Sequence, residues 1–304
     1  MPFDAQKTEK EPARLFERLG SAIERRQGAG PFVTLVSHTL PSGWVRLNAS
    51  RRDRKGLGPQ FIHPDGTPHC LKVGNPWLRF WAPDRLAWWV AVCFVLGSVH
   101  FTLGPVFSIS GWGLAGRARA LWYFIGSIFF TMASYLQYLE ALNAPLGPEY
   151  FGKGPGAGPS RPHWRWFGFF PKHVAFWASF PQFLGTLCFN VNCWAGLSVN
   201  QSVAAAWEKE WATGVTGSVF FLVSAWFAIL EVCHTHFAFE PRNISWWVVW
   251  TNFLGCAGFL VGAILALPGV GSGWILCADN WFNFQGGLFF LISSYLMLPE
   301  LFSE

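Results

Sequence analysis

Six stretches without a charged residue follow one another from residue 86 onward. They cover residues 86–116, 120–139, 173–207, 211–230, 243–278 and 280–299. An α-helix needs about 20 apolar residues to cross the hydrocarbon core of a bilayer, and buried helices of soluble proteins are usually shorter. Ended at their Gly, Pro and Asn clusters, the stretches predict six membrane-spanning helices, near 86–108, 120–141, 174–198, 212–233, 246–268 and 281–301.

The composition agrees with a multi-pass membrane protein. Hydrophobic residues make up 52% of the 304 residues and charged residues only 13%, about half of the usual ~25%. This composition excludes a disordered chain and a coiled coil, and it leaves too few charges to cover a soluble globule. The segment before the first span is long and polar, so we expect no secretory signal in it.

Lysine and arginine lie mostly on one side of the predicted spans. Nineteen precede the first span or lie in the second-to-third and fourth-to-fifth connections. The other connections contain three, Arg117, Arg119 and Lys209. Because loops rich in Lys and Arg stay in the cytoplasm, we expect both termini to be cytoplasmic.

A short motif recurs in every predicted span. Each span contains a Gly followed four residues later by Phe, and in five of the six a small residue follows seven residues after the Gly. The pairs are Gly97 and Phe101, Gly126 and Phe130, Gly185 and Phe189, Gly217 and Phe221, Gly255 and Phe259, and Gly286 and Phe290. Positions four and seven apart share one helix face, and small residues let helices approach closely in lipid. We interpret the motif as a helix-packing stripe.

The spans also group in pairs. Fourteen residues after the Gly of the second, fourth and sixth spans stand Glu140, Glu231 and Glu300. The other spans have no acid at this offset, so the repeating unit is a two-helix hairpin present three times. The pseudo-symmetry axis that relates the three hairpins should run along the membrane normal. The sequence thus predicts an all-α membrane protein with a small cytoplasmic α/β tail. Its parts are the tail 1–85, hairpins 86–142, 173–233 and 234–304, and a Gly/Pro-rich linker 143–172.

The three carboxylates are expected at the cytoplasmic interface. Each follows another charged residue by 21 positions, a helical distance of about 31 Å that matches the membrane thickness. Glu at an interface usually caps a helix or pairs with a nearby Lys or Arg. The alternative is a ring of three carboxylates at one mouth of the bundle, which could attract a cation.

The second helix of each hairpin resembles the membrane unit of the YrhK-like family. The segments are FIGSIFFTMASYLQYLE (124–140), TGSVFFLVSAWFAILE (216–231) and FQGGLFFLISSYLMLPE (284–300). They share the Gly–small–x–x–Phe pattern and the final Glu, whereas the first helices fit less well, and Pro105 and Asn192 interrupt the small-residue stripe. The resemblance covers residues 86–304. It implies a multi-pass protein of the bacterial cytoplasmic (inner) membrane and no reaction or functional residue.

The tail combines a helix, a hairpin and a basic cluster. Residues 8–26 have the pattern of an amphipathic helix, and residues 32–48 read as two strands joined by a turn at 41–43. The cluster comprises Arg51, Arg52, Arg54 and Lys55. It fits the ordinary excess of positive charge on the cytoplasmic side, and the alternative is binding to anionic lipid headgroups. No nucleic-acid-binding motif surrounds it.

Signals of metal or catalytic chemistry are weak. Cys233, His234 and His236 are possible metal ligands beside Glu231, but residues two apart at a helix end need not converge. The seven Cys contain no C-x-x-C pair. No Ser–His–Asp arrangement, phosphate loop or dinucleotide fingerprint is present, so we expect neither an enzyme nor a cofactor.

Two classes of function remain. The repeated packing stripe and the uncharged spans favour a structural or accessory protein that contacts lipid, another membrane protein or a second copy of itself. The pseudo-threefold repeat, the three Glu and the amides within spans favour a transporter or channel for a small solute or ion. These amides are Gln182, Asn190, Asn192, Asn252, Asn283 and Gln285. A continuous polar path would distinguish the second class.

Overall fold

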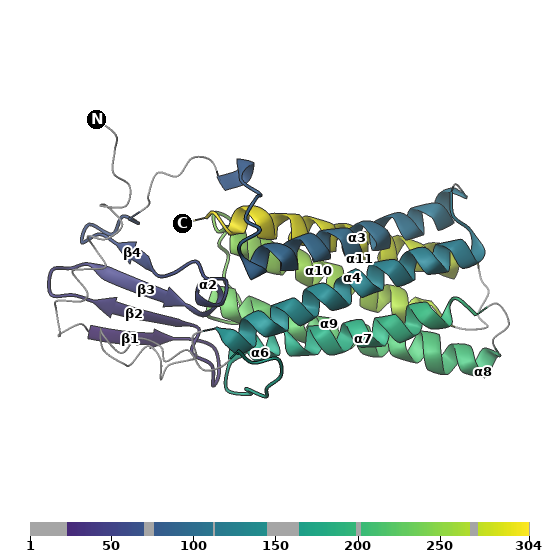
Figure 1. Ribbon diagram of the computed structural model, residues 1–304, viewed down its shortest axis with the longest axis horizontal. Helices are drawn as coiled ribbons and strands as arrows, with labels where there is room; N and C mark the ends of the chain where they lie inside the picture. The colour runs from purple at the N-terminus through teal and green to yellow at the C-terminus, as the bar shows by residue number, and fades with distance from the viewer. Residues whose placement is uncertain are drawn as a thin grey trace.

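A small antiparallel sheet stands at one end of a long helical bundle (Figure 1). The structure, a computed structural model, describes residues 23–69, 76–111, 113–144, 164–198, 202–267 and 273–303. Most of the predicted linker 143–172 and most of the predicted helix 8–26 lie outside these ranges.

The sheet is a four-stranded meander in the order β1 (Ile23–Gln27), β2 (Leu35–Thr39), β3 (Val45–Ala49) and β4 (Gln60–Ile62). The predicted hairpin forms, since β2 and β3 pair with Leu35 opposite Ala49. Gly43 has the positive φ of 86° that its turn requires. The helix predicted over 8–26 is wrong at its end, because residues 23–26 pair with β2 as part of β1.

A single helical turn, α2 (Ser50–Arg54), begins directly after β3 and lies between the sheet and the bundle (Figure 1). The carbonyl of Thr34 at the start of β2 accepts a hydrogen bond from the Ser50 backbone (2.9 Å). This bond, together with the sheet, fixes where the side chains of α2 enter the bundle. A 3-10 turn, η1 (Pro76–Leu78), follows β4 along the described chain.

Within the described ranges, four helices are long and apolar enough to cross a membrane, at residues 86–110, 174–195, 204–233 and 244–265. The described helices are α3 (Leu86–Ser110), α4 (Gly116–Asn143), α6 (Val174–Trp177), α7 (Phe180–Ala195), α8 (Val203–Ala206), α9 (Ala212–Cys233), α10 (Ile244–Leu265) and α11 (Gly273–Glu300). A π-helical turn, η2 (Trp207–Trp211), joins α8 to α9. The helices α4 and α11 have 28 residues each, and α11 is continuous although its sequence contains Asn280, Asn283 and Gln285.

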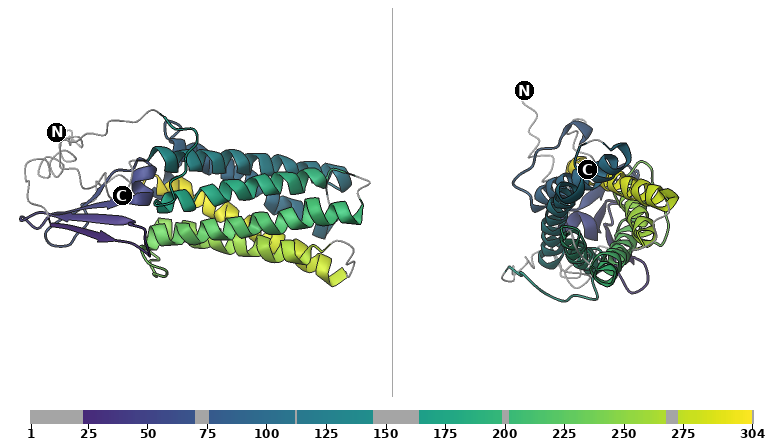
Figure 2. Two further views of the ribbon diagram at one scale, coloured as in Figure 1. Left: turned by 90° about the horizontal axis from the view of Figure 1, so that it is seen from below. Right: turned by 90° about the vertical axis from the view of Figure 1, so that its right-hand side faces the viewer.

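The long helices form a closed ring. Neighbours around the ring are α3, α4, α7, α9, α10 and α11, and α11 packs against α3 to complete it. The end-on view shows the helices around a common axis, with the sheet behind them (Figure 2). Helices consecutive in the chain are therefore also neighbours in space.

The Gly–Phe motif is used reciprocally within each pair of helices. A Cβ atom on Gly97 of α3 would lie 2.5 Å from the Phe130 ring of α4, and one on Gly126 would lie 3.2 Å from the Phe101 ring. The pair α7–α9 has the same exchange of Gly185 and Gly217 with Phe221 and Phe189, and α10–α11 that of Gly255 and Gly286 with Phe290 and Phe259. Each Gly thus makes room for the aromatic ring of its partner helix.

The six Phe of the motif meet on the axis of the ring. Phe101, Phe189 and Phe259 form a triangle with ring centroids 5.7 to 6.0 Å apart. Phe290 contacts Phe130 and Phe221 at 5.7 and 6.1 Å. All six side chains are buried, and aromatic pairs at these distances attract one another beyond their hydrophobic burial. We call these residues the phenylalanine core.

Candidate functional site

Three carboxylates converge at the end of the bundle that faces the sheet. Glu140, Glu231 and Glu300 lie in the last turns of α4, α9 and α11, and they are 5%, 0% and 1% exposed. Unpaired carboxylates so far from water would be strongly destabilising. Their burial therefore requires cations within the protein.

The cations come from α2 and the residue after it. Arg51 donates through Nε and Nη2 to both oxygens of Glu300 (2.6 and 3.0 Å), and Lys55 binds the same carboxylate. Arg54 bridges the other two, with Nη2 at 3.1 Å from Glu231 and Nη1 at 3.1 Å from Glu140. We call Arg51, Arg54, Lys55, Glu140, Glu231 and Glu300 the charge cluster; it balances three cations with three carboxylates.

Hydroxyl groups complete two of the three carboxylates. Ser50 donates to Glu231 (2.8 Å) and Ser245 donates to Glu300 (2.6 Å). Glu140 receives one bond from Arg54, and its Oε1 has no hydrogen-bond partner among the described residues. The three carboxylates thus do not accept equal numbers of hydrogen bonds, and Glu140 accepts the fewest.

Burial and charge oppose each other at the cations of α2. Burial lowers the pKa of Lys55 to about 8, although Glu300 acts to raise it. For Arg54, burial also acts to lower the pKa, but the neighbouring Glu231 and Glu140 outweigh it and hold the pKa above its ordinary value. Arg54 therefore stays charged, whereas Lys55 is the cation of the cluster that loses its proton most readily.

These contacts show what the predicted site residues do in the structure. The three carboxylates of the predicted ring are brought together, and their nearest cations are side chains of this chain. Of the lipid-headgroup candidates, Arg51, Arg54 and Lys55 are buried against Glu. Arg52 binds the carbonyls of Gly58 and Ser303 instead. The sequence contains both groups, three Glu at one offset and four basic residues within 51–55, but it does not show that the two groups lie close together.

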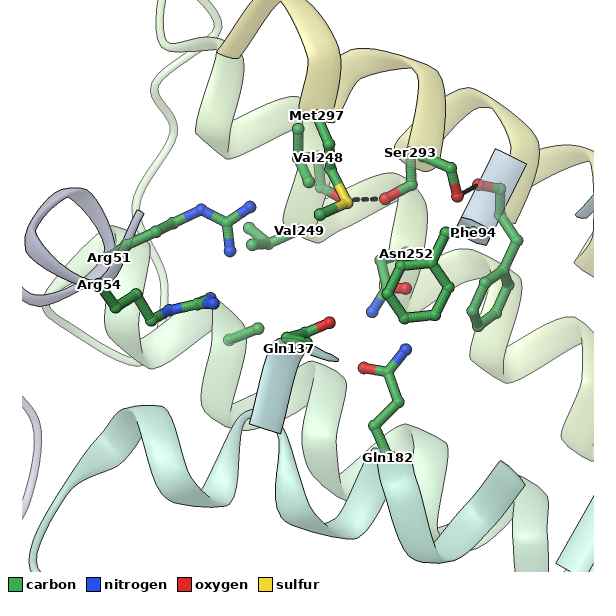
Figure 3. Close-up of a pocket in the computed structure, with 13 residues that line it drawn as sticks. Arg51, Arg54, Phe94, Gln137, Gln182, Val248, Val249, Asn252, Ser293 and Met297 are labelled. Carbon is green, nitrogen blue, oxygen red and sulfur yellow. Dashed lines mark hydrogen bonds between the residues drawn. The ribbon is translucent and has the colours of Figure 1, made fainter. Parts of the chain in front are cut away.

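A cavity of about 30 Å³ lies below the cluster, on the side away from the sheet (Figure 3). The guanidinium groups of Arg51 and Arg54 point into it, and the amides of Gln137, Gln182 and Asn252 lie opposite (Figure 3). We call it the central cavity. Gln182 and Asn252 stand three residues before the Gly of their helices, as does Phe94, which also lines it. These equivalent positions place the cavity on the axis of the ring.

A larger cleft of about 920 Å³ lies beside the cluster. It runs between the segment that contains α2 and β4 and the loop that joins α9 to α10. We call it the side cleft. Arg51 lines both this cleft and the central cavity, so its side chain borders both spaces.

The predicted amides are split between two roles. Gln182 and Asn252 line the central cavity. The other four make hydrogen bonds within or between helices: Asn190 to Thr131, Asn192 to the Glu210 carbonyl, Asn283 to Asp279, and Gln285 to the Leu254 carbonyl. The six amides therefore lie in separate groups along the bundle, and the phenylalanine core fills the axis between helices.

The weak metal candidates are not brought together. Cys233 is buried, His234 bonds to Thr34 (2.8 Å), and His236 stacks on Trp226. In the described ranges no three His, Cys, Asp or Glu side chains are placed to hold a metal ion. His63 and His69 do meet in the tail, 2.9 Å apart, but the neighbouring Cys70 lies outside the described residues.

A second repeated feature joins the starts of α3, α6 and α10 to the loops before them. In each helix the indole of the fourth residue donates to the carbonyl of a Pro in the preceding loop: Trp89 to Pro83, Trp177 to Pro171 and Trp247 to Pro241, at 2.9 to 3.0 Å. Two residues before each Pro stands an aromatic residue, Trp81, Phe169 or Phe239, that is 69%, 68% or 71% exposed. We call these three the exposed aromatics; the sequence signal for them is Pro-x5-Trp.

Comparison with known proteins finds no relative of this chain. No family model matches the chain, and no curated protein or solved structure matches it either. The resemblance to the YrhK-like family therefore stays a hypothesis that rests on the segments at 124–140, 216–231 and 284–300.

The energetic character of the charge cluster follows from its burial alone. Two buried ions attract each other strongly, but each first loses several kcal/mol of hydration, so such a cluster adds little net stability. Removing one partner, in contrast, leaves an uncompensated charge and is strongly destabilising. Chemically, the cluster can hold α2 in one position, and it can close the mouth of the bundle.

Proposed function

We propose that the chain is a six-span protein of the bacterial inner membrane, built from three helical hairpins. Each of the pairs α3–α4, α7–α9 and α10–α11 has the reciprocal Gly–Phe contacts and the same kind of preceding loop. The helices α4 and α11 count as spans in this proposal because 28 residues extend about 42 Å, more than the ~30 Å of hydrocarbon.

The exposed aromatics support a position for the membrane. Trp81, Phe169 and Phe239 occupy equivalent places before their hairpins and are mostly exposed. Aromatic side chains gather at the interface between lipid and water, so we place this interface at their level. The sheet and both ends of the described chain then lie on one side, which the excess of Lys and Arg identifies as the cytoplasm.

Within this arrangement we infer a structural or accessory role. The observation that carries it is the closure of the axis at two levels. The phenylalanine core fills the middle, and α2 fills the mouth through the charge cluster. A rigid, closed bundle that carries a firmly attached cytoplasmic sheet suits a subunit that binds lipid and another membrane protein or a second copy of itself.

Mass spectrometry of the protein purified from its own membrane in a mild detergent tests this role. We expect a second protein, or a second copy, in constant stoichiometry over repeated preparations. The variant Glu231→Gln, which removes one of the three carboxylates that hold α2, serves as a comparison, since a partner held by the attached sheet should be depleted from it. A chain that carries only lipid in both preparations would contradict the accessory role.

The transport alternative is favoured by one observation, that Arg51 lines both the side cleft and the central cavity. In this alternative α2 moves and admits a small ion to the axis. Flux into liposomes that contain the purified protein tests it. The accessory role predicts no flux above that of empty liposomes, and no difference between the natural chain and Glu140→Gln.

A further inference from the structure

The central cavity has hydrogen-bond donors that no described residue uses. Nη1 of Arg51, Nε2 of Gln182 and Nδ2 of Asn252 have no hydrogen-bond partner among the described residues, and all three residues line the cavity. Arg51 and Gln182 are 7% and 6% exposed. Buried donors normally have a partner, and leaving one unpaired destabilises the folded state. A ligand that accepts several hydrogen bonds would satisfy these donors.

The lining of the cavity favours a negative ligand. Two guanidinium groups and three amides surround it, together with apolar side chains and two serines, and none of its lining residues is a carboxylate. The serine hydroxyls, Ser293 and Ser294, already donate to the carbonyls of Val248 and Phe290. The unused groups named above are N–H donors, and one of them, Nη1 of Arg51, is charged; the nitrogens of Arg54 already bind Glu140 and Glu231.

The volume limits the size of the ligand. About 30 Å³ exceeds the ~10–15 Å³ that one water-sized particle needs, but it is far below the ~300 Å³ of a metabolite pocket. We propose that the central cavity binds one chloride-sized anion, held by Arg51 and Arg54 on one side and by Gln182 and Asn252 on the other. The anion reaches it from the side cleft past Arg51. This proposal is independent of the accessory role.

Thermal unfolding of the purified protein in detergent tests the proposal, with tryptophan fluorescence as the signal. Sodium chloride, sodium bromide and sodium gluconate are compared at one ionic strength. A ligand of the folded state raises Tm as its concentration exceeds Kd. We expect a saturable rise in Tm with chloride and bromide and none with gluconate, which is too large for the cavity. Equal Tm values in all three salts would overturn the proposal.

Matched variants separate binding from folding. Asn252→Leu and Gln182→Met keep the bulk of the side chain and remove one donor, so the apparent affinity for chloride should fall at least about tenfold. Asn190→Leu is the control, because Asn190 is an amide of α7 that binds Thr131 outside the cavity. It should keep the chloride effect even if it lowers Tm in every salt.

A bromide derivative locates the ligand. Crystals grown with bromide should show an anomalous difference peak between the guanidinium groups and the amide of Asn252. Density without an anomalous signal would mean that water fills the cavity, and the proposal would then be wrong.

Discussion

At the scale of single residues, the charge cluster links stability to every one of its members. Glu231 accepts from Arg54 and Ser50 and is fully buried. We expect Glu231→Gln to lower the free energy of unfolding by about 3–5 kcal/mol, because Arg54 then keeps only Glu140 as a partner. Denaturant unfolding in detergent, followed by tryptophan fluorescence, measures the change.

The control for this substitution is Glu240→Gln. Glu240 lies in the partly exposed loop before α10 and accepts from Asn243 (3.0 Å). Its loss should change stability by about 1 kcal/mol or less. Equal losses in the two variants would show that burial of the cluster does not decide its energetics.

Lys55 gives the cluster a dependence on pH. Its pKa is lowered by burial to about 8, whereas the ordinary value is 10.5. Between these values the unfolded chain binds the proton and the folded chain does not, so this residue makes stability rise with pH from about 8 to 10.5. Below pH 8 both states hold the proton and its contribution is constant.

Thermal unfolding between pH 7 and 11 checks this behaviour. Relative to the natural chain, Lys55→Met should lose stability as the pH rises from about 8 to 10.5, because only the natural chain gains stability in this range. Lys172→Met, at an exposed lysine, controls for the removal of a charge. A difference between Lys55→Met and the natural chain that does not change with pH would contradict the expectation.

The sequence allowed us to predict which carboxylates belong to the charge cluster, but not which cations they pair with. Glu140, Glu231 and Glu300 share one offset from the Gly of the motif, and in the structure they lie in the last turns of α4, α9 and α11 at the same end of the ring. Their pairing with Arg51 and Arg54 could not be predicted, since it depends on how the sheet places α2 over the axis. Neither periodicity nor charge counting contains that long-range contact.

At the scale of elements, the Gly–Phe contacts set the distance between paired helices. A Cβ atom on Gly185 would lie 2.7 Å from the Phe221 ring and 2.8 Å from the Gly217 carbonyl. We expect Gly185→Ala to destabilise the protein by about 1–3 kcal/mol, because the backbones of α7 and α9 must move apart. Denaturant unfolding in detergent measures this loss.

Gly273→Ala, at the start of α11, is the matched control. A Cβ atom at Gly273 would meet nothing within 4 Å, so the substitution should be neutral or slightly stabilising. If both variants unfold alike, close packing at the motif is not what holds α7 and α9 together.

Elements were predictable where the pattern was long and local. The apolar stretches indicated the positions of the long helices. The break between α6 and α7 was not predicted, although Pro181 follows it directly. It frees the carbonyl of Ala178, which accepts from Gln137 (3.2 Å) and Ser224 (2.8 Å). Strand β1 was missed because its pairing with β2 outweighs a helical pattern in a short segment.

At the scale of the whole molecule, the six-span proposal fixes which side of the membrane each end of α11 faces. Cys277 is exposed near its first turn, and Ser303 follows its last. In intact cells a membrane-impermeant maleimide should label Cys277. A cysteine at Ser303→Cys should react only after the membrane is opened. Each cysteine is tested alone, with the other cysteines replaced by Ala.

The outcome separates three arrangements. Labelling of both positions from the same side would mean that α11 does not cross the membrane. Labelling of Ser303→Cys in intact cells, with Cys277 protected, would mean that the orientation is inverted.

The contact between Arg51 and Glu300 can form only late in synthesis, because 249 positions separate the two residues. At about 5–20 residues per second, a ribosome needs some tens of seconds to travel from one to the other. During that interval α2 lacks its last carboxylate partner, while in the proposed arrangement the helices enter the membrane one after another. The mouth of the bundle can therefore close only after α11 has been synthesised. In a chain that stops earlier, α2 lacks Glu300 and forms a loose, cationic segment that proteases can recognise.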